Sequence, residues 1–301
     1  MTMWGELYNW LQSIAWLFGG AEGLWVRAVI GAAGGITIAA TAVRSSSLTR
    51  QGAVSAAIMG TGYTALGGLL WFGSLLVFFT TSSMLSRWKR KHRRKAEAEL
   101  LYEKTGARDA GQVWANGGVG LALCAANAIW PHNGWLYAFI GVMAAVNADT
   151  WATELGSLSR VLPISIRTGK RVPAGTSGGI TAAGSGAAAA GALTIGIFAG
   201  CAALIPGAWS EEGAAGAVIG TIVVTALLGG MLGAFVDSYL GAAVQVMYRC
   251  EVCMKETERA LHCGRPASVI RGFRWLNNDA VNLLSSVAAG AAALVISQMI
   301  G

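Results

Sequence analysis

The sequence predicts an all-α fold, a polytopic bundle of transmembrane helices, and three observations carry that prediction. Only 12% of the 301 residues are charged, which is about half the share found in a soluble domain. Glycine is about twice as frequent as average, with 42 residues that follow no three-residue period. Long uncharged apolar runs recur along the chain. These features exclude a disordered chain, collagen, a basic nucleic-acid-binding protein and an ordinary cytosolic enzyme.

Six apolar runs are each long enough to cross a hydrocarbon core about 30 Å thick. They cover residues 24–43, 113–130, 135–153, 180–205, 214–247 and 279–300. A further run, 52–85, is too long for one upright span and short for two, so we expect a hairpin of two short helices turning near residues 66–71. The sequence therefore predicts about eight spans, two of them short.

Two segments need separate treatment. Residues 214–247 would form a helix of about 50 Å, so we expect it either to project into the cytoplasm or to break near Gly229, Gly230 and Gly233. Residues 1–22 repeat apolar side chains at three- and four-residue spacing, which favours an interfacial helix over a span. Residues 1–301 would then form a single integral-membrane domain.

The placement of basic residues predicts the orientation of this domain. All but one of the 22 Lys and Arg residues lie in four segments, 44–50, 86–110, 160–171 and 249–277. With eight spans these segments face one side, and Lys and Arg near span ends are retained in the cytoplasm. We therefore expect a multi-pass protein of the cell membrane with these loops cytoplasmic. The exception is Arg27.

Acidic residues near the cytoplasmic ends of the spans are candidates for function, because ionisable groups in spans are costly. There are four such carboxylates: Asp149, Glu154, Asp237 and Asp279. Three amides adjoin them: Asn147, Asn278 and Asn282. Carboxylate and amide oxygens suit Mg²⁺. The structural alternative is that Asp279 caps a helix and that Asp149 pairs with an arginine.

A glycine-rich turn opens the 180–205 segment directly after a basic loop that contains Lys170 and Arg171. Its members are Gly175, Thr176, Ser177, Gly178 and Gly179. Backbone N–H groups at a helix entry bind phosphate, and the two hydroxyls add donors. The alternative is a flexible helix entry with orienting charge. Beside the carboxylates, the turn favours a nucleotide or polyphosphate site at the inner membrane face.

The last cytoplasmic loop, residues 249–277, carries a group of potential metal ligands. They are Cys250, Cys253, His262 and Cys263. A reducing compartment disfavours disulfides, and three thiols with one imidazole form a candidate structural Zn²⁺ site that would staple the loop. Free thiols in a packed loop, or a redox pair, are the alternatives.

Several motifs in order resemble those of one integral-membrane family, which contains the chloroplast phytyl-phosphate kinase and transmembrane protein 19 and carries domain of unknown function 92. They span residues 147–156, 172–179, 237–245 and 277–282. Residues 45–52, 112–117 and 250–263 fit as well. The resemblance thus covers most of the chain from about residue 27 onward.

The resemblance implies a Mg²⁺-dependent kinase that converts an isoprenoid monophosphate (phytyl, geranylgeranyl or farnesyl phosphate) to the diphosphate, with CTP or another nucleoside triphosphate as donor. On this basis we assign Asp149, Asp237 and Asp279 to Mg²⁺ and the triphosphate, with Glu154 in support. The phosphate-binding positions that we expect are Asn147, Asn278, Asn282, Lys170, Arg171, residues 175–179, Gln112 and Asn116. The prenyl tail would lie between glycine-rich spans.

Other functions remain open from the sequence. A CTP-dependent cytidylyltransferase or a polyprenol kinase acting on a lipid would need similar groups. A membrane transporter would also carry intramembrane acids and broken helices, although these acids cluster at one face and no inverted repeat is visible. The basic run at residues 87–95 is typical of a segment that lies on anionic headgroups, so no nucleic-acid partner is expected.

Overall fold

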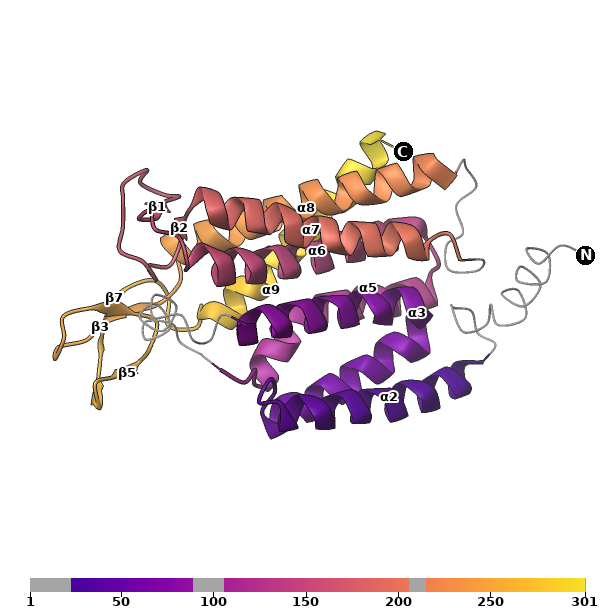
Figure 1. The fold of residues 1–301 in the computed structure, drawn as a ribbon, viewed down its shortest axis with the longest axis horizontal. Coiled ribbons are helices and arrows are strands. Elements are labelled where there is room, and N and C mark those ends of the chain that lie inside the picture. Colours follow the sequence, from indigo (N-terminus) through magenta and orange to yellow (C-terminus); the bar gives the residue numbers. More distant parts are fainter. Residues whose placement is uncertain (1–22, 89–105, 206–214, 301) are drawn as a thin grey trace, which may run out of the picture.

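The computed structural model describes residues 23–88, 106–205 and 215–300, and their helices form an elongated bundle with short strands at one end (Figure 1). The helices are α2 (Leu24–Arg44), α3 (Arg50–Trp88), α5 (Ala110–Ile129), α6 (Asn133–Gly156), α7 (Ala182–Ala202), α8 (Ala215–Ala243) and α9 (Asn278–Ile300). Every predicted apolar run is helical, and the helix bounds agree with the expected ones within a few residues. The all-α class is confirmed.

Four of these helices, α2, α7, α8 and α9, are long and apolar enough to cross a membrane. The total of about eight spans stays a prediction, because the other helical segments do not establish it. The expected interfacial helix at residues 1–22 and most of the basic loop at residues 86–110 lie outside the described residues.

The hairpin expected within residues 52–85 is confirmed. Helix α3 is broken at Gly68, whose φ of 72° and ψ of −156° are not helical and suit glycine because it lacks a Cβ. The two halves then run side by side: a Cβ placed on Gly60 in the first half would lie 3.3 Å from the Phe72 ring in the second. The break falls inside the predicted 66–71 turn.

Arg27, the basic residue outside the four basic segments, stabilises this hairpin. Its side chain is only 1% exposed, and its Nε donates a hydrogen bond to the carbonyl of Ala65 at 3.0 Å. Ala65 lies three residues before Gly68, where the break leaves helical carbonyls without their usual partners. Arg27 therefore caps the first half of α3 from the neighbouring helix.

Replacing Arg27 by Met should lower the stability of the protein in detergent. The loss of a buried hydrogen bond from a charged donor costs about 1.5–3 kcal/mol, which should appear as a fall in the melting temperature measured by thermal unfolding. Arg44→Met, at an exposed position of the same helix, is the control. Equal melting of the two variants would contradict the capping role.

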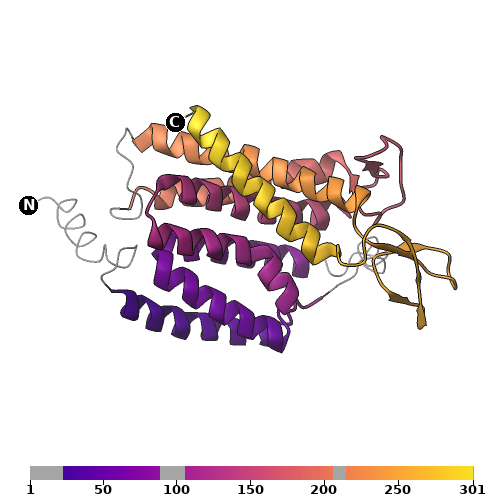
Figure 2. The same ribbon diagram turned by 180° about the vertical axis from the view of Figure 1, so that it is seen from behind.

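Helix α6 is the centre of the bundle. Every residue from 136 to 148 is buried, because α6 contacts α3, α5, α7, α8 and α9. Figure 2 shows α9 running diagonally across the bundle. A helix that is apolar all round is expected in such a position. Its last two turns carry Asp149 and Glu154 to the end of the bundle where the strands lie.

Helix α8 runs unbroken through its glycines for 29 residues, about 44 Å, so a break near Gly229, Gly230 and Gly233 is wrong. These glycines serve close packing instead. A Cβ on Gly230 would lie 2.9 Å from the Ala144 Cβ, and one on Gly233 would lie 2.8 Å from the Ala289 Cβ. Small residues allow such approaches in membrane bundles. Asp237 therefore lies on a continuous helix beside α6.

The described parts of the four basic loops gather at one end of the bundle (Figure 1). The strands there are β1 (Ile164–Ser165), β2 (Gly179–Ile180), β3 (Met247–Arg249), β4 (Glu256–Thr257), β5 (Leu261–His262), β6 (Arg265–Pro266) and β7 (Ser268–Arg271). Antiparallel pairing joins β1 to β2 and β5 to β6, and β3 lies between β4 and β7. The cytoplasmic assignment of this end stays a prediction.

Candidate functional site

A polar cavity of about 310 Å³ opens at the loop end of the bundle. Helices α3, α5, α6, α7, α8 and α9 and the two strand-bearing loops contribute to its wall. Most of the predicted site residues line it: Asp149, Glu154, Asp237, residues 175–179, Asn278, Asn282, Gln112 and Asn116. Residues that are more than 150 positions apart in the sequence thus meet in one place.

Carboxylates from two central helices face this cavity. Asp149 comes from α6 and Asp237 from α8, and the negative charges of Asp149 and Glu258 both repel that of Asp237. The Oγ of Ser285 in α9 donates a hydrogen bond to Asp237 Oδ2 at 3.1 Å, and this bond orients the carboxylate. Mg²⁺ is usually held by one or two carboxylates together with substrate phosphates. The pair is therefore chemically suited to a divalent cation.

The glycine-rich turn lies against the end of α8. Gly178 has a φ of +79°, and a Cβ there would lie 2.6 Å from the carbonyl of Ser238, so only glycine fits. One expectation is corrected: the turn does not open the helix directly. Gly179–Ile180 pairs with β1 as strand β2, and α7 begins at Ala182 after its N-cap Thr181. The turn and the helix N-terminus nevertheless both line the cavity.

Gln245 is a cavity residue whose role the sequence did not reveal. Its side chain is 2% exposed, its Oε1 accepts a hydrogen bond from Ser177 Oγ at 3.0 Å, and its Nε2 is buried without a hydrogen-bond partner. A buried donor that lacks an acceptor is costly. Gln245 lines the cavity, so a small movement of this amide would bring its free donor to an acceptor such as a phosphate oxygen.

Arg108 is the second cavity residue that sequence reasoning missed. Its Nη1 donates to Ser83 Oγ at 3.3 Å, and its guanidinium lies 5.5 Å from the centre of the Phe78 ring, within cation–π range. Burial lowers the pKa of Arg108, while the charge of Glu154 acts to raise it. An arginine remains protonated under such opposing effects, so Arg108 places a fixed positive charge in the wall.

The backbone of Arg108 is held by the first basic loop. Its N–H donates to the carbonyl of Ser47 and its carbonyl accepts from the N–H of Thr49, each at 3.0 Å. A Cβ on Gly52 would overlap the Arg108 carbonyl. This explains the 45–52 motif structurally. The signal that could have revealed Arg108 is its position apart from the basic run and directly before the next helix.

Gln112, predicted to bind phosphate, also has a structural task. Its Oε1 accepts from the Asp109 N–H at 3.2 Å, and its own N–H donates to Asp109 Oδ1 at 2.9 Å. This capping box starts α5. Glu154 is likewise engaged, since it accepts a hydrogen bond from Ser86 Oγ at 2.5 Å. Both side chains are thus fixed in the cavity wall by neighbouring elements.

Four predicted residues do not line the cavity: Asn147, Lys170, Arg171 and Asp279. The side chain of Asn147 is fully buried. Its Oδ1 accepts from Thr81 and Ser82 of α3, and its Nδ2 donates to the carbonyl of Gly191 in α7 at 2.8 Å. The structure therefore gives Asn147 a packing role in place of the expected phosphate-binding one.

Lys170, Arg171 and Asp279 lie outside the cavity lining, and local structure accounts for the position of each. Lys170 and Arg171 are exposed, in a loop where the backbone at Arg171 pairs with Ile164. Asp279 occupies the first turn of α9, where Asn277 Oδ1 accepts from the Ala280 N–H at 3.1 Å. Capping at this helix start is therefore done by Asn277, whereas Asn278 and Asn282 face the cavity.

An apolar pocket of about 60 Å³ adjoins the polar cavity. It lies between α2, both halves of α3 and α5, and Phe72 and Phe79 are among its walls. Three residues line both hollows: Arg108, Gln112 and Asn116. The positive charge of Arg108 thus stands where an acid-lined polar space meets an apolar one.

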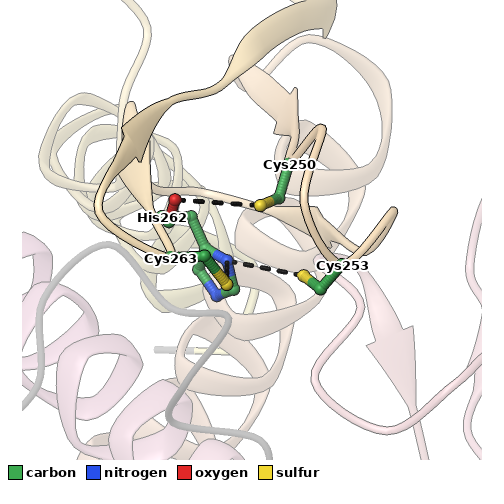
Figure 3. Close-up of side chains that lie close together, drawn as sticks. All are labelled: Cys250, Cys253, His262 and Cys263. Atoms are coloured by element: carbon green, nitrogen blue, oxygen red, sulfur yellow. Dashed lines mark hydrogen bonds between the residues drawn. The ribbon is translucent and has the colours of Figure 1, made fainter.

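The predicted Cys/His group comes together outside this cavity, in the loop between α8 and α9 (Figure 3). The potential ligand atoms of its four members lie within 4.8 Å of one another. Among the residues that the structure describes, it is the one such group of three or more Cys, His, Asp and Glu side chains. The sequence-based grouping is therefore matched in space.

The fold and the site together define a helical membrane protein with an acid-lined polar cavity at one end. The chain matches the family described as Integral membrane protein DUF92 over residues 33–290, and it belongs to that family. It is 33% identical over 229 residues to Protein PGR of Arabidopsis thaliana, an alignment that covers 70% of this chain and 76% of that protein.

A second relative comes from another organism. The chain is 34% identical over 155 residues to an uncharacterized membrane protein of Methanocaldococcus jannaschii, covering 52% of this chain and 63% of that protein. No solved structure matches.

Proposed function

We propose that this protein is a membrane prenyl-phosphate kinase, which transfers the γ-phosphoryl group of a nucleoside triphosphate, CTP by family resemblance, to an isoprenoid monophosphate. One observation carries the proposal: the acid-lined cavity and the apolar pocket share Arg108, Gln112 and Asn116. A substrate with a phosphate head and a hydrocarbon tail has one chemistry suited to each space. The pocket would take the first part of the tail, and the rest would run into lipid.

The reaction needs no covalent participation by the protein, because phosphoryl transfer depends on positioning and charge neutralisation. The acceptor monophosphate has a second pKa of about 6, so it is largely a dianion at neutral pH. Its oxygen forms the new bond to the γ-phosphorus while the bond to the β-phosphate oxygen breaks, and CDP leaves. No general base is required. His132 and His262 do not line the cavity, and His92 lies outside the described residues.

The residues divide into a donor side and an acceptor side. Asp149 and Asp237 would hold Mg²⁺, which supplies positive charge to the triphosphate. The 175–179 turn and the buried amide of Gln245 would donate hydrogen bonds to the phosphates of the nucleotide. Arg108, at the mouth of the apolar pocket, would bind the acceptor phosphate. This division leaves the two phosphates facing each other across one cavity.

The proposal also fixes an orientation. A nucleotide-dependent cavity must open to the compartment that holds the nucleotide, and the basic loops at the same end are typical of the cytoplasmic side. We therefore place the cavity at the cytoplasmic face of the cell membrane, with the apolar pocket opening sideways to the bilayer.

A single assay tests this function. Purified protein in lipid nanodiscs is incubated with Mg²⁺, labelled CTP and either geranylgeranyl or phytyl monophosphate or a free polyprenol, and the products are separated. Prenyl diphosphate plus CDP supports the kinase. A CDP-lipid with pyrophosphate release indicates a cytidylyltransferase, and phosphorylation of a free polyprenol but not of the monophosphate indicates a polyprenol kinase. No product, with uptake of substrate into proteoliposomes, indicates a transporter; each of these last three outcomes contradicts the proposal.

A further inference from the structure

We propose that Cys250, Cys253, His262 and Cys263 bind one Zn²⁺ ion, which holds the loop between α8 and α9 in its folded form. This site is separate from the phosphoryl-transfer cavity, and its ligand class follows from the donors: three thiols and one imidazole suit tetrahedral zinc.

The distances from the His262 imidazole to two of the thiols match those of a zinc tetrahedron. Zn–S bonds of about 2.3 Å and Zn–N bonds of about 2.0–2.1 Å place a sulfur and a nitrogen ligand about 3.5 Å apart. His262 Nδ1 lies 3.6 Å from Cys253 Sγ and 3.3 Å from Cys263 Sγ. All four donor atoms lie within 4.8 Å of one another. Small movements would therefore complete the coordination, with Nδ1 as the imidazole ligand.

The ligands come from two turns that face each other (Figure 3). Cys250 and Cys253 lie in the turn after β3, where the Cys250 N–H donates to the Lys255 carbonyl at 3.0 Å. His262 ends β5, and Cys263 follows it in the tight turn before β6. Each turn supplies two ligands, an arrangement that joins the β5–β6 hairpin to the β4–β3–β7 sheet.

Apolar packing contributes little to holding these two pieces together. Most side chains between residues 251 and 270 are exposed or only partly buried, and exposed apolar ones include Met254 and Leu261, each 66% exposed. Pieces of fewer than about 40 residues usually need metals or disulfides to fold, and all three cysteines here are free thiols. A metal ion would supply the missing stabilisation.

The zinc site would also brace the cavity wall. Glu258, which lines the cavity and is 8% exposed, lies in the sequence between the two ligand pairs. At the opposite edge of the β4–β3–β7 sheet, Arg271 of β7 donates hydrogen bonds to the carbonyls of Gly241 and Ala242 at the end of α8. Fixing the loop therefore fixes the position of Glu258 relative to Asp237.

The test is elemental analysis of the purified full-length protein in detergent, expressed with zinc in the medium. We expect about one zinc per chain in the wild type, at least tenfold less in Cys253→Ser, and an unchanged content in Cys201→Ser, which alters an exposed cysteine of α7. Absent zinc, equal zinc in Cys253→Ser, stoichiometric iron, or a Cys250–Cys253 disulfide found by mass spectrometry would each overturn the proposal.

A second measurement uses the wild type alone, so that a poorly folded variant cannot confuse the result. Chelation should make trypsin cleavage after Lys255 and Arg259 several-fold faster, and added Zn²⁺, but not Mg²⁺, should restore the slow rate. Cleavage that is indifferent to the chelator would contradict a zinc-held loop. Neither readout depends on kinase activity, so failure of the proposed function leaves this test intact.

Discussion

Asp149→Asn should reduce phosphoryl transfer at least about a hundredfold while leaving the protein folded. The substitution keeps the shape of the side chain and removes its charge, and cation-mediated charge stabilisation is worth several kcal/mol in the transition state, where each 1.36 kcal/mol is tenfold in rate. Because the charges of Asp149 and Asp237 repel each other, the variant without cation should melt at the same temperature as the wild type or higher. The measurements are turnover with CTP and prenyl phosphate, and thermal unfolding.

Two comparisons sharpen this result. Glu251→Gln removes one charge from an exposed position at the same end of the bundle and should leave turnover unchanged. Mg²⁺ should raise the melting temperature of the wild type, since a ligand that binds only the folded state stabilises it, and should raise that of Asp149→Asn less. Near wild-type turnover in folded Asp149→Asn would refute the assignment.

Loss of activity with gain of stability is the expected signature of a functional site that is costly to fold. The packing of helix α6 offsets this cost in stability. Its residues 136–148 are buried on all sides, so packing along the bundle fixes the helix and its final turns can carry Asp149 toward Asp237. The acids are therefore held by a part of the fold that is remote from them.

The helices and the acids could be predicted because each has a recognisable pattern in the local sequence. An apolar run of about 20 residues marks a span, a cluster of glycines marked the break at Gly68, and a lone acid such as Asp149 or Asp237 stands out against an apolar background. The unbroken course of α8 could not be predicted, because glycines such as Gly233 serve kinks and close packing equally well, and only the neighbouring helices decide between them.

The cavity wall was harder to predict, for the same reason. Asn147 and Asn278 both adjoin an acid in sequence, yet the first joins α6 to α3 and α7 and the second lines the cavity. Gln245 gains its role from burial against Ser177, which no local pattern encodes. Arg108 belongs to a basic segment whose charge already has an explanation in membrane orientation. Such residues are identified by tertiary neighbours.

Arg108→Gln should raise the KM for the prenyl phosphate about 10- to 150-fold and change the KM for CTP little. A charged hydrogen bond is worth about 1.5–3 kcal/mol, and each 1.4 kcal/mol is tenfold in affinity. Arg108 lines both the polar cavity and the apolar pocket, so it would lie between the phosphate head and the hydrocarbon tail of the acceptor. Its loss should therefore weaken binding of the acceptor. Steady-state kinetics with each substrate varied in turn measure the split.

The controls separate acceptor binding from structure. Arg50→Gln changes an exposed arginine at the start of α3 and should leave both KM values as they are. Arg108→Lys keeps the charge but loses the planar fork of donors, so it should recover part of the acceptor affinity. If Arg108→Gln instead raised the KM for CTP alone, Arg108 would belong to the donor side, and the acceptor phosphate would have to be bound by Gln112 and Asn116, the two other residues shared by the polar cavity and the apolar pocket.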